Sequence, residues 1–225
     1  MSRIEHHPDE ATITSYAAGS LPAALALVVG CHLQYCPECR NSLAVGEVLG
    51  GSLMAGLAPQ SLSTSARQNM LDRLSKQPGF SLAAEQNTDR PNQAEEPSRQ
   101  LPRLLHRYFD QDKLKDLPWK RTLAPGLREV VVDCGEGNVR LLRIAAGRKM
   151  PVHSHQGNEL TLILSGGYSD ALGQFNAGDV ADLDGSVEHQ PVADADEDCI
   201  CLAGMDAPLV FKGWMARLIQ PLVGF

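Results

Sequence analysis

The chain has 225 residues and a formal net charge of −7, with 20 Lys and Arg against 27 Asp and Glu. Its hydrophobic fraction of 43% is ordinary for a folded protein and excludes a chain that is disordered throughout. An acidic chain without a run of Lys or Arg lacks the features that bind phosphate backbones, so we expect no direct contact with DNA or RNA.

The apolar stretches and the N-terminal residues indicate where the protein works. The longest apolar stretch, residues 21–29, is far shorter than the ~20 residues that cross a bilayer, and the first residues lack the apolar centre of a signal peptide. We therefore expect a cytoplasmic protein with no membrane partner. Its six cysteines should then be reduced, which favours metal or redox chemistry over a disulfide framework.

Residues 1–78 are predicted to form an all-α domain. Asp9 can cap a first helix, and Pro22 suits the first turn of a second helix. A third helix is expected to begin near Pro37, and a fourth near Ser65. The fourth helix has a narrow apolar stripe with little sign of another helix to cover it, formed by Met70, Leu71 and Leu74.

The rest of the chain has a different pattern. Residues 79–100 are polar, contain prolines and show no periodicity, which indicates a linker. Over residues 101–225, short apolar runs alternate with glycines, which is typical of an antiparallel barrel or sandwich. The sequence thus predicts a multidomain protein, with a helical domain, a linker and an all-β domain.

A first set of candidate metal ligands has the spacing H-x3-C-x2-C, at His32, Cys36 and Cys39. Zinc takes four nitrogen or sulfur ligands, and two thiolates of a C-x2-C pair can reach one ion. The fourth ligand must come from elsewhere; His7 is the best candidate, and the adjacent His6 stays open. The competing interpretation is a redox C-x2-C, or a buried cysteine pair beside a core histidine.

This N-terminal pattern resembles the zinc-binding anti-sigma domain. In that family three helices gather around the zinc ion, and a fourth lies between two domains of an extracytoplasmic-function sigma factor. The resemblance implies Zn²⁺ ligands at His7, His32, Cys36 and Cys39. It also implies that Met70, Leu71 and Leu74 bind the partner, whereas the pattern alone is equally compatible with packing on the bundle.

A second set of candidate ligands lies in the C-terminal half. His153, His155 and Glu159 have the same parity, so an extended backbone would place them on one face. Nitrogen and oxygen ligands suit Zn²⁺ or another divalent transition metal, and such a site can keep a coordination position open.

The wider spacing around these residues is similar to the first motif of the cupin superfamily, with Gly147 and Gly166 at its ends. Residues 178–189 are similar to the second cupin motif and add His189, although they depart from it at turn positions. The resemblance implies a double-stranded β-helix, or jelly-roll barrel, with a metal at His153, His155, Glu159 and His189. Fold and ligand set do not decide whether such a site catalyses a reaction or holds a small-molecule ligand.

Taken together, the two parts resemble the ChrR-like anti-sigma factors over almost the whole chain. Further stretches that carry the resemblance are Tyr16–Gly19, Gly50–Met54, Glu159–Leu162 and Asp198–Ala203. The resemblance implies a protein that sequesters an extracytoplasmic-function sigma factor. It also implies that the cupin domain is needed to release the sigma factor under singlet-oxygen or related oxidative stress.

Three other hypotheses compete with this one. The first is a dioxygenase-like cupin metalloenzyme with a regulatory zinc domain. The second is direct redox sensing by the N-terminal thiolates, with a cupin that is only structural. The third concerns Cys199 and Cys201, which share one face of a predicted strand and could act in redox chemistry near the metal, although core packing is commoner.

Overall fold

The computed structural model describes residues 3–76, 100–135, 137–207 and 209–211, without the side chains of His155 and 209–211. The chain divides into two compact units, residues 1–50 together with 96–225, and residues 51–95. The linker predicted at 79–100 falls almost entirely outside the described residues. The division into domains at 1–78 and 101–225 therefore stays a prediction.

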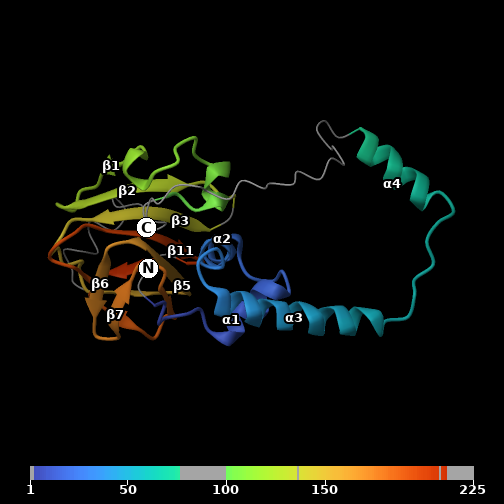
Figure 1. Ribbon diagram of the computed structural model, residues 1–225, viewed down its shortest axis with the longest axis horizontal. Helices are drawn as coiled ribbons and strands as arrows, with labels where there is room; N and C mark the ends of the chain where they lie inside the picture. The colour runs from blue at the N-terminus through green and yellow to red at the C-terminus, as the bar shows by residue number, and fades with distance from the viewer. Residues whose placement is uncertain (1–2, 77–99, 136, 208, 212–225) are drawn as a thin grey trace. The chain divides into compact units, whose positions relative to one another are not determined.

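The described N-terminal region contains four α-helices, as the sequence predicts (Figure 1). They are α1 (Glu10–Ala17), α2 (Ala23–His32), α3 (Pro37–Ala55) and α4 (Ala66–Ser75). Asp9 caps α1 by accepting a hydrogen bond from the backbone N–H of Thr12. Pro22 lies one position before α2, where its missing N–H costs nothing. Two short 3-10 helices follow, η2 (Arg103–Arg107) and η3 (Leu114–Asp116).

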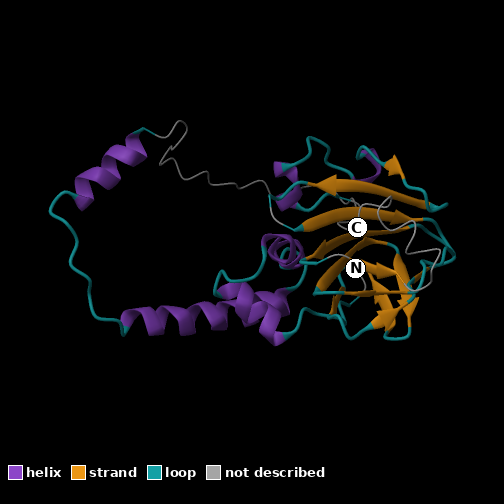
Figure 2. Cartoon of the chain, turned by 180° about the vertical axis from the view of Figure 1, so that it is seen from behind, coloured by secondary structure: helices purple, strands orange, loops and turns teal. Residues whose placement is uncertain are grey.

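The C-terminal part is β-rich, which confirms the predicted all-β class (Figure 2). Its described strands are β1 (Lys120–Arg121), β2 (Leu127–Val132), β3 (Asn138–Ile144), β4 (His153–His155), β5 (Glu159–Ser165), β6 (Gly167–Asp170), β7 (Gly173–Asn176), β8 (Val180–Leu183), β9 (Glu188–His189), β10 (Val192–Ala193), β11 (Cys199–Met205) and β12 (Leu209–Phe211). They form antiparallel sheets in the orders β1-β2-β3-β11-β5-β8, β10-β6-β7 and β12-β4-β9.

One face of the six-stranded sheet packs against the N-terminal helices. Cross-strand register puts Val130, Leu141, Leu202 and Leu162 side by side on this face. All four are buried in one apolar cluster with Val28 of α2. Residues 1–50 therefore share a hydrophobic core with the β-sheet, because the sheet has a second apolar face to bury.

The opposite face of the same sheet points into the barrel. Ile144, Cys199 and Ile163 lie on this face and share a second apolar cluster with Tyr168 of β6 and Phe175 of β7. The Tyr168 and Phe175 rings stack with centroids 4.9 Å apart. This second core closes the space between the large sheet and the β10-β6-β7 sheet, next to the residues of the predicted cupin metal set.

Helix α2 is enclosed on several sides. A Cβ on Gly204 of β11 would lie 2.6 Å from the Ala24 carbonyl oxygen and 2.8 Å from a methyl group of Val28. A Cβ on Gly30 would lie 2.7 Å from a methyl group of Leu104 in η2. The side chains of α2 are apolar nearly all round, which is typical of a helix buried between other elements.

Candidate functional site

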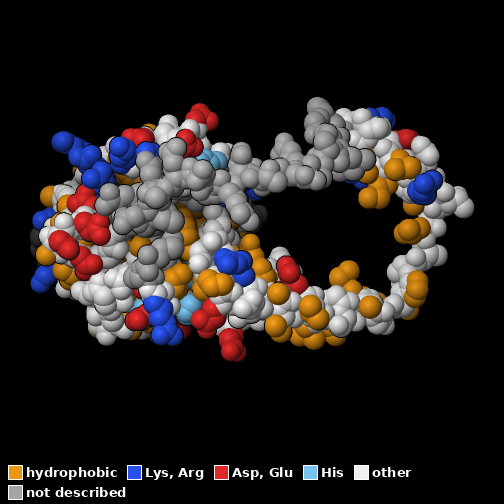
Figure 3. Space-filling model, viewed as in Figure 1, with side chains coloured by type: hydrophobic (Ala, Val, Ile, Leu, Met, Phe, Trp, Pro, Cys, Tyr) orange, Lys and Arg blue, Asp and Glu red, His pale blue; other side chains and the backbone are white. Residues whose placement is uncertain are grey.

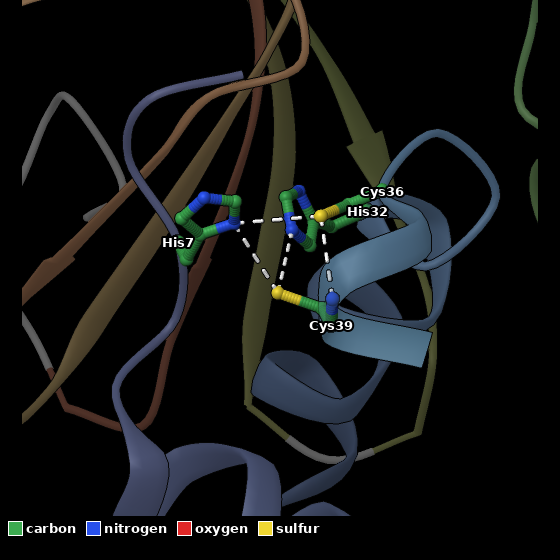
Figure 4. Close-up of side chains that lie close together, drawn as sticks. All are labelled: His7, His32, Cys36 and Cys39. Atoms are coloured by element: carbon green, nitrogen blue, oxygen red, sulfur yellow. Dashed lines mark hydrogen bonds between the residues drawn. The ribbon is translucent and has the colours of Figure 1, made fainter. Parts of the chain in front are cut away.

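The N-terminal candidate ligands come together from three segments (Figure 4). His7 lies in the extended segment before α1, His32 ends α2, Cys36 precedes α3 and Cys39 lies in the first turn of α3. Their ligand atoms lie within 4.8 Å of one another. His32 Nε2 is 3.3 Å from Cys39 Sγ, and His7 Nδ1 is 3.4 Å from the Sγ atoms of both cysteines.

The donor set and the distances fit a tetrahedral ion. With nitrogen at ~2.0 Å and sulfur at ~2.3 Å from Zn²⁺, tetrahedral ligands stand about 3.3–3.8 Å apart. The observed nitrogen–sulfur separations of 3.3–3.4 Å lie at the lower end of that range. Four protein ligands would leave no open coordination position, so the arrangement suits a metal that holds the fold together.

The hydrogen bonding of His32 prepares it for this role. Its Nδ1–H donates to the Gly178 carbonyl oxygen at 3.0 Å, so the Nε2 lone pair points at the cluster. Burial lowers the pKa of His32 to about 4, although the Gly178 bond acts in the opposite direction. The imidazole is therefore neutral near pH 7, as a metal ligand must be.

The structure distinguishes between the two adjacent N-terminal histidines. His7 joins the cluster, whereas the His6 ring lies against Phe175 with centroids 4.3 Å apart. His6 Nε2 is 3.0 Å from the Gln174 carbonyl oxygen in β7. Consecutive residues of an extended segment point in opposite directions, so only one of the two can face the cysteines.

The segment that carries His7 is bound to the start of β8. The fully buried carboxylate of Asp179 accepts hydrogen bonds from the backbone N–H groups of Glu5 at 2.7 Å and His6 at 3.1 Å. Its second oxygen accepts from Asn176 N at 2.8 Å. The Val180 N–H in turn donates to the His6 carbonyl oxygen at 3.1 Å. One buried side chain therefore connects the barrel to the residue next to a metal-ligand candidate.

A second carboxylate of β8 continues this connection along α1. Asp182 Oδ2 accepts from Asp9 N at 3.0 Å and from Thr12 Oγ1 at 2.9 Å. Burial raises the pKa of Asp182, which these two hydrogen bonds partly offset. Asp182 in β8 and the two residues before this strand, Gly178 and Asp179, together attach α1, His32 and the His7 segment to the barrel. Sequence reasoning missed this role, because no local pattern marks a carboxylate whose partners lie over 170 residues away.

In the barrel, the structure brings together two members of the second candidate set. His153 Nε2 and His189 Nε2 are 3.0 Å apart, and both side chains are buried. His153 Nδ1 faces the Pro151 carbonyl oxygen at 2.8 Å, and His189 Nδ1 faces Asp170 Oδ2 at 2.9 Å. Both Nδ1 atoms therefore act as donors, which leaves two Nε2 lone pairs directed at each other. Such an approach requires a shared proton or cation, so these residues fit a metal ion.

The other two members of the set are placed less completely. Glu159 is buried at the start of β5, where its carboxylate accepts from Thr161 Oγ1 at 2.8 Å. The backbone of His155 lies in β4, but its side chain is outside the described residues. The described side chains form no further group of three or more candidate ligands around His153 and His189. The complete four-ligand set therefore stays a prediction.

Asp170 is a residue of this region that the sequence did not reveal. Its carboxylate is fully buried and paired with the His189 imidazole. A carboxylate that accepts the N–H of a ligating histidine fixes the ring orientation and increases its basicity. No motif position marks it, since it lies on β6, between the two cupin motifs in the sequence.

Two buried thiols line the same interior. Cys199 and Cys201 lie on one face of β11, and neither forms a disulfide bond. The neighbouring Cys199 and burial raise the pKa of Cys201, and Glu159 adds to the effect. Burial raises the pKa of Tyr168, with further contributions from Asp170 and Cys201. The redox role suggested for the two cysteines is a prediction that this geometry leaves open.

Helix α3 carries an unusual set of exposed apolar side chains (Figure 3). Val45, Leu49 and Leu53 recur every four residues along one face, and they are 71%, 61% and 67% exposed. Cys39 is the buried residue of this helix in the structure. In α4, the predicted stripe has Met70 and Leu71 exposed and Leu74 half-buried. The exposed row on α3 and the exposed residues on α4 are each candidates for a binding surface.

Comparison with known proteins identifies the family. The family model of the ChrR cupin-like domain matches residues 112–207. The chain is 40% identical to "Anti-sigma-E factor ChrR" of Cereibacter sphaeroides over 219 residues, covering 97% of each chain. This chain belongs to the ChrR family of anti-sigma factors.

A solved structure of a family member has the same fold. The chain matches ChrR in the "Crystal Structure of Rhodobacter sphaeroides SigE in complex with the anti-sigma ChrR" with a TM-score of 0.73 and 38% identity. The match covers 91% of this chain and 100% of that chain. Within the described part of this ChrR family member, no helix is long and apolar enough to cross a membrane.

Proposed function

We propose that the protein is a cytoplasmic anti-sigma factor that binds and inhibits one extracytoplasmic-function sigma factor. Zn²⁺ held by His7, His32, Cys36 and Cys39 would stabilise the partner-binding helices. Family membership supports this function, since the ChrR relative is named an anti-sigma-E factor and the ChrR structure is a complex with SigE. The chain itself would bind no nucleic acid.

The observation that carries the proposal is the exposed apolar face of α3. A partner that buried Val45, Leu49 and Leu53 would gain about 1.5–3 kcal/mol of binding free energy from each side chain, before the costs of association. Their i, i+4, i+8 spacing suits a helix that lies in an apolar groove. Met70, Leu71 and Leu74 of α4 would extend the same binding mode to a second helix.

A charge placed on this face tests the proposal. Leu49→Glu should abolish co-purification with the sigma factor encoded beside this protein, and should leave thermal stability unchanged because the side chain is exposed. Ala44→Glu introduces the same charge at an exposed position of α3 away from the Val45–Leu49–Leu53 row, so it should bind as the wild type does. Equal binding by both variants would contradict an α3 interface.

We also propose that the barrel controls release of the sigma factor under oxidative stress of the singlet-oxygen kind. A divalent metal at His153, His155, Glu159 and His189 would supply the sensing chemistry or the site for a small-molecule ligand. The contacts of Gly178 and Asp179 support this role, because Gly178 contacts the ligand candidate His32 and Asp179 holds the two residues before His7. A stimulus can shift the complex only by its differential stabilisation of the released state.

The combined substitution of His153→Ala and His155→Ala tests the release step separately from binding. The double variant should still bind and inhibit the sigma factor, but it should no longer release it in cells exposed to singlet oxygen. Unchanged release would refute a sensory barrel and favour sensing by the N-terminal thiolates. Turnover of a small dicarbonyl or enol substrate by the metal-loaded protein would instead support the alternative of a dioxygenase-like enzyme.

A further inference from the structure

A hollow with a volume of about 360 Å³ lies on the barrel, and none of its lining residues is a member of either metal-ligand set. It is formed by the loop between β1 and β2 and by the adjoining ends of β2, β3 and β11, and its volume is within the range of small-ligand sites. The lining residues are Arg121, Thr122, Ala124, Pro125, Gly126, Leu127, Arg128, Arg143, Ala145 and Asp198. None of them belongs to the sites described above.

Three arginines form a row along this hollow. Arg121 on β1 is paired directly with Arg128 on β2, and Arg128 is paired directly with Arg143 on β3. Side chains directly opposite in antiparallel strands start from Cβ atoms only about 4.5–5.5 Å apart, and like charges in such pairs are destabilising. The sheet therefore places three arginines at adjacent positions of one face, although like charges in such positions repel.

One carboxylate among the lining residues compensates part of this charge. Arg143 Nε donates to Asp198 Oδ2 at 2.7 Å, and Asp198 Oδ1 accepts from Ala146 N at 3.1 Å. Burial raises the pKa of Asp198, but the Arg143 hydrogen bond and the charges of Arg143 and Arg128 outweigh it and lower the pKa overall. Three cations thus face one anion in the lining, within a chain whose formal net charge is −7.

The backbone around the hollow is held in place by its own hydrogen bonds. The single O–H of Thr122 faces the carbonyl oxygens of Ala124 and Leu127, each 3.2 Å from Oγ1, and Oγ1 accepts from Ala124 N at 3.2 Å. The Gly126 carbonyl oxygen accepts from Ala145 N at 2.9 Å. Gly126 has φ +83°, and a Cβ there would lie 3.4 Å from the side chain of Arg148, which brings a fourth arginine beside the hollow. Figure 3 shows Lys and Arg side chains gathered near β1.

We propose that this hollow binds a small dianionic oxyanion, presented by a phosphate ester or a dicarboxylate. Guanidinium groups bind such groups through paired N–H donors, and this binding gives both strength and orientation. Asp198 holds Arg143 through Nε, while the exposed Arg121 and Arg128 reach the ligand from the neighbouring strands. The ligand would also relieve the repulsion along the row. This site does not depend on whether the protein binds a sigma factor.

Calorimetric titration of the full-length, zinc-loaded protein tests the proposal. The probes are inorganic phosphate and succinate, each compared with chloride at the same ionic strength. We expect saturable binding of at least one dianion, weakened about tenfold or more by Arg128→Gln, since each hydrogen bond to a charged group contributes substantially. Arg107→Gln removes the same charge from an exposed position in η2, outside the hollow, and should leave the affinity unchanged.

The two probes also distinguish the ligand class. Preference for phosphate would indicate a phosphate ester, and preference for succinate a dicarboxylate. Heats that do not saturate, or that chloride reproduces at equal ionic strength, would overturn the proposal. It would also be overturned if Arg107→Gln weakened binding as much as Arg128→Gln, since that result indicates only general attraction of anions.

Discussion

Substituting Asp179 should loosen the N-terminal metal cluster without touching any of its ligands. The Asp179 carboxylate is fully buried and accepts three backbone N–H donors, two of them from Glu5 and His6 in the segment that carries His7. A hydrogen bond to a charged group contributes about 1.5–3 kcal/mol. Because this range is already net of exchange with water, the two bonds to the N-terminal segment stabilise its docked position by about 3–6 kcal/mol.

The assay follows the metal rather than global unfolding. Cobalt bound by Cys36 and Cys39 gives a thiolate-to-metal charge-transfer absorption that an all-nitrogen and oxygen site cannot give. For Asp179→Ala, loss of this absorption after addition of a chelator should be at least about 100-fold faster than in the wild type, which corresponds to the lower limit of about 3 kcal/mol. Asp179→Asn keeps one acceptor oxygen and should be intermediate.

A matched variant separates this effect from a general loss of stability. Asp198→Ala also removes a carboxylate that accepts a backbone N–H, but that residue has no contact with the N-terminal segment among the hydrogen bonds described. It should lower the free energy of unfolding and leave cobalt release unchanged. Equal release rates for Asp179→Ala and the wild type would refute the idea that β8 holds His7 in place.

Three further predictions concern other parts of the molecule. Gly204→Ala would place a Cβ 2.6 Å from the Ala24 carbonyl oxygen, so α2 must shift. We expect the free energy of unfolding in urea to fall by about 1–3 kcal/mol. An unchanged urea midpoint would contradict the close packing. Asp170→Asn removes the carboxylate that orients His189. The affinity of the barrel for a metal ion, measured in competition with a chelator, should therefore fall about 10–100-fold, with secondary structure retained. Asp198 has a lowered pKa in the folded state, so the stability it contributes is present above the unfolded-state pKa of about 3.9 and is lost as pH falls through its folded pKa. The stability difference between the wild type and Asp198→Asn should therefore be constant from about pH 5 to 8 and shrink below about pH 4 in urea unfolding at each pH; a difference that grew on acidification would contradict the assigned ion pair.

The ligand clusters could be predicted where spacing along the chain determines geometry. His32, Cys36 and Cys39 lie within eight consecutive residues, so the H-x3-C-x2-C spacing limits how far apart their side chains can be before any fold is known. The choice between His6 and His7 needed the structure, because it depends on which side of the N-terminal segment faces β7. The Phe175 ring and the Gln174 carbonyl oxygen decide it, and both are far away in the sequence.

The relation between the helices and the barrel could not be predicted. The apolar residues of α2 do not reveal that β11 and β5 cover this helix. That packing is possible because Gly204 has no side chain, and a hydrophobic pattern in the sequence does not reveal such a close approach. Asp179 and Asp170 were missed for a similar reason, since a buried carboxylate is recognised by its partners and those partners are assembled only by the fold.

The most direct test of the anti-sigma function is transcription in vitro with the purified sigma factor and core RNA polymerase. We predict that the zinc-loaded wild-type protein forms a stable complex with the sigma factor and stops transcription from its promoter, whereas Leu49→Glu leaves transcription unchanged. Full transcription in the presence of excess zinc-loaded wild-type protein, with no complex on gel filtration, would contradict the proposed function.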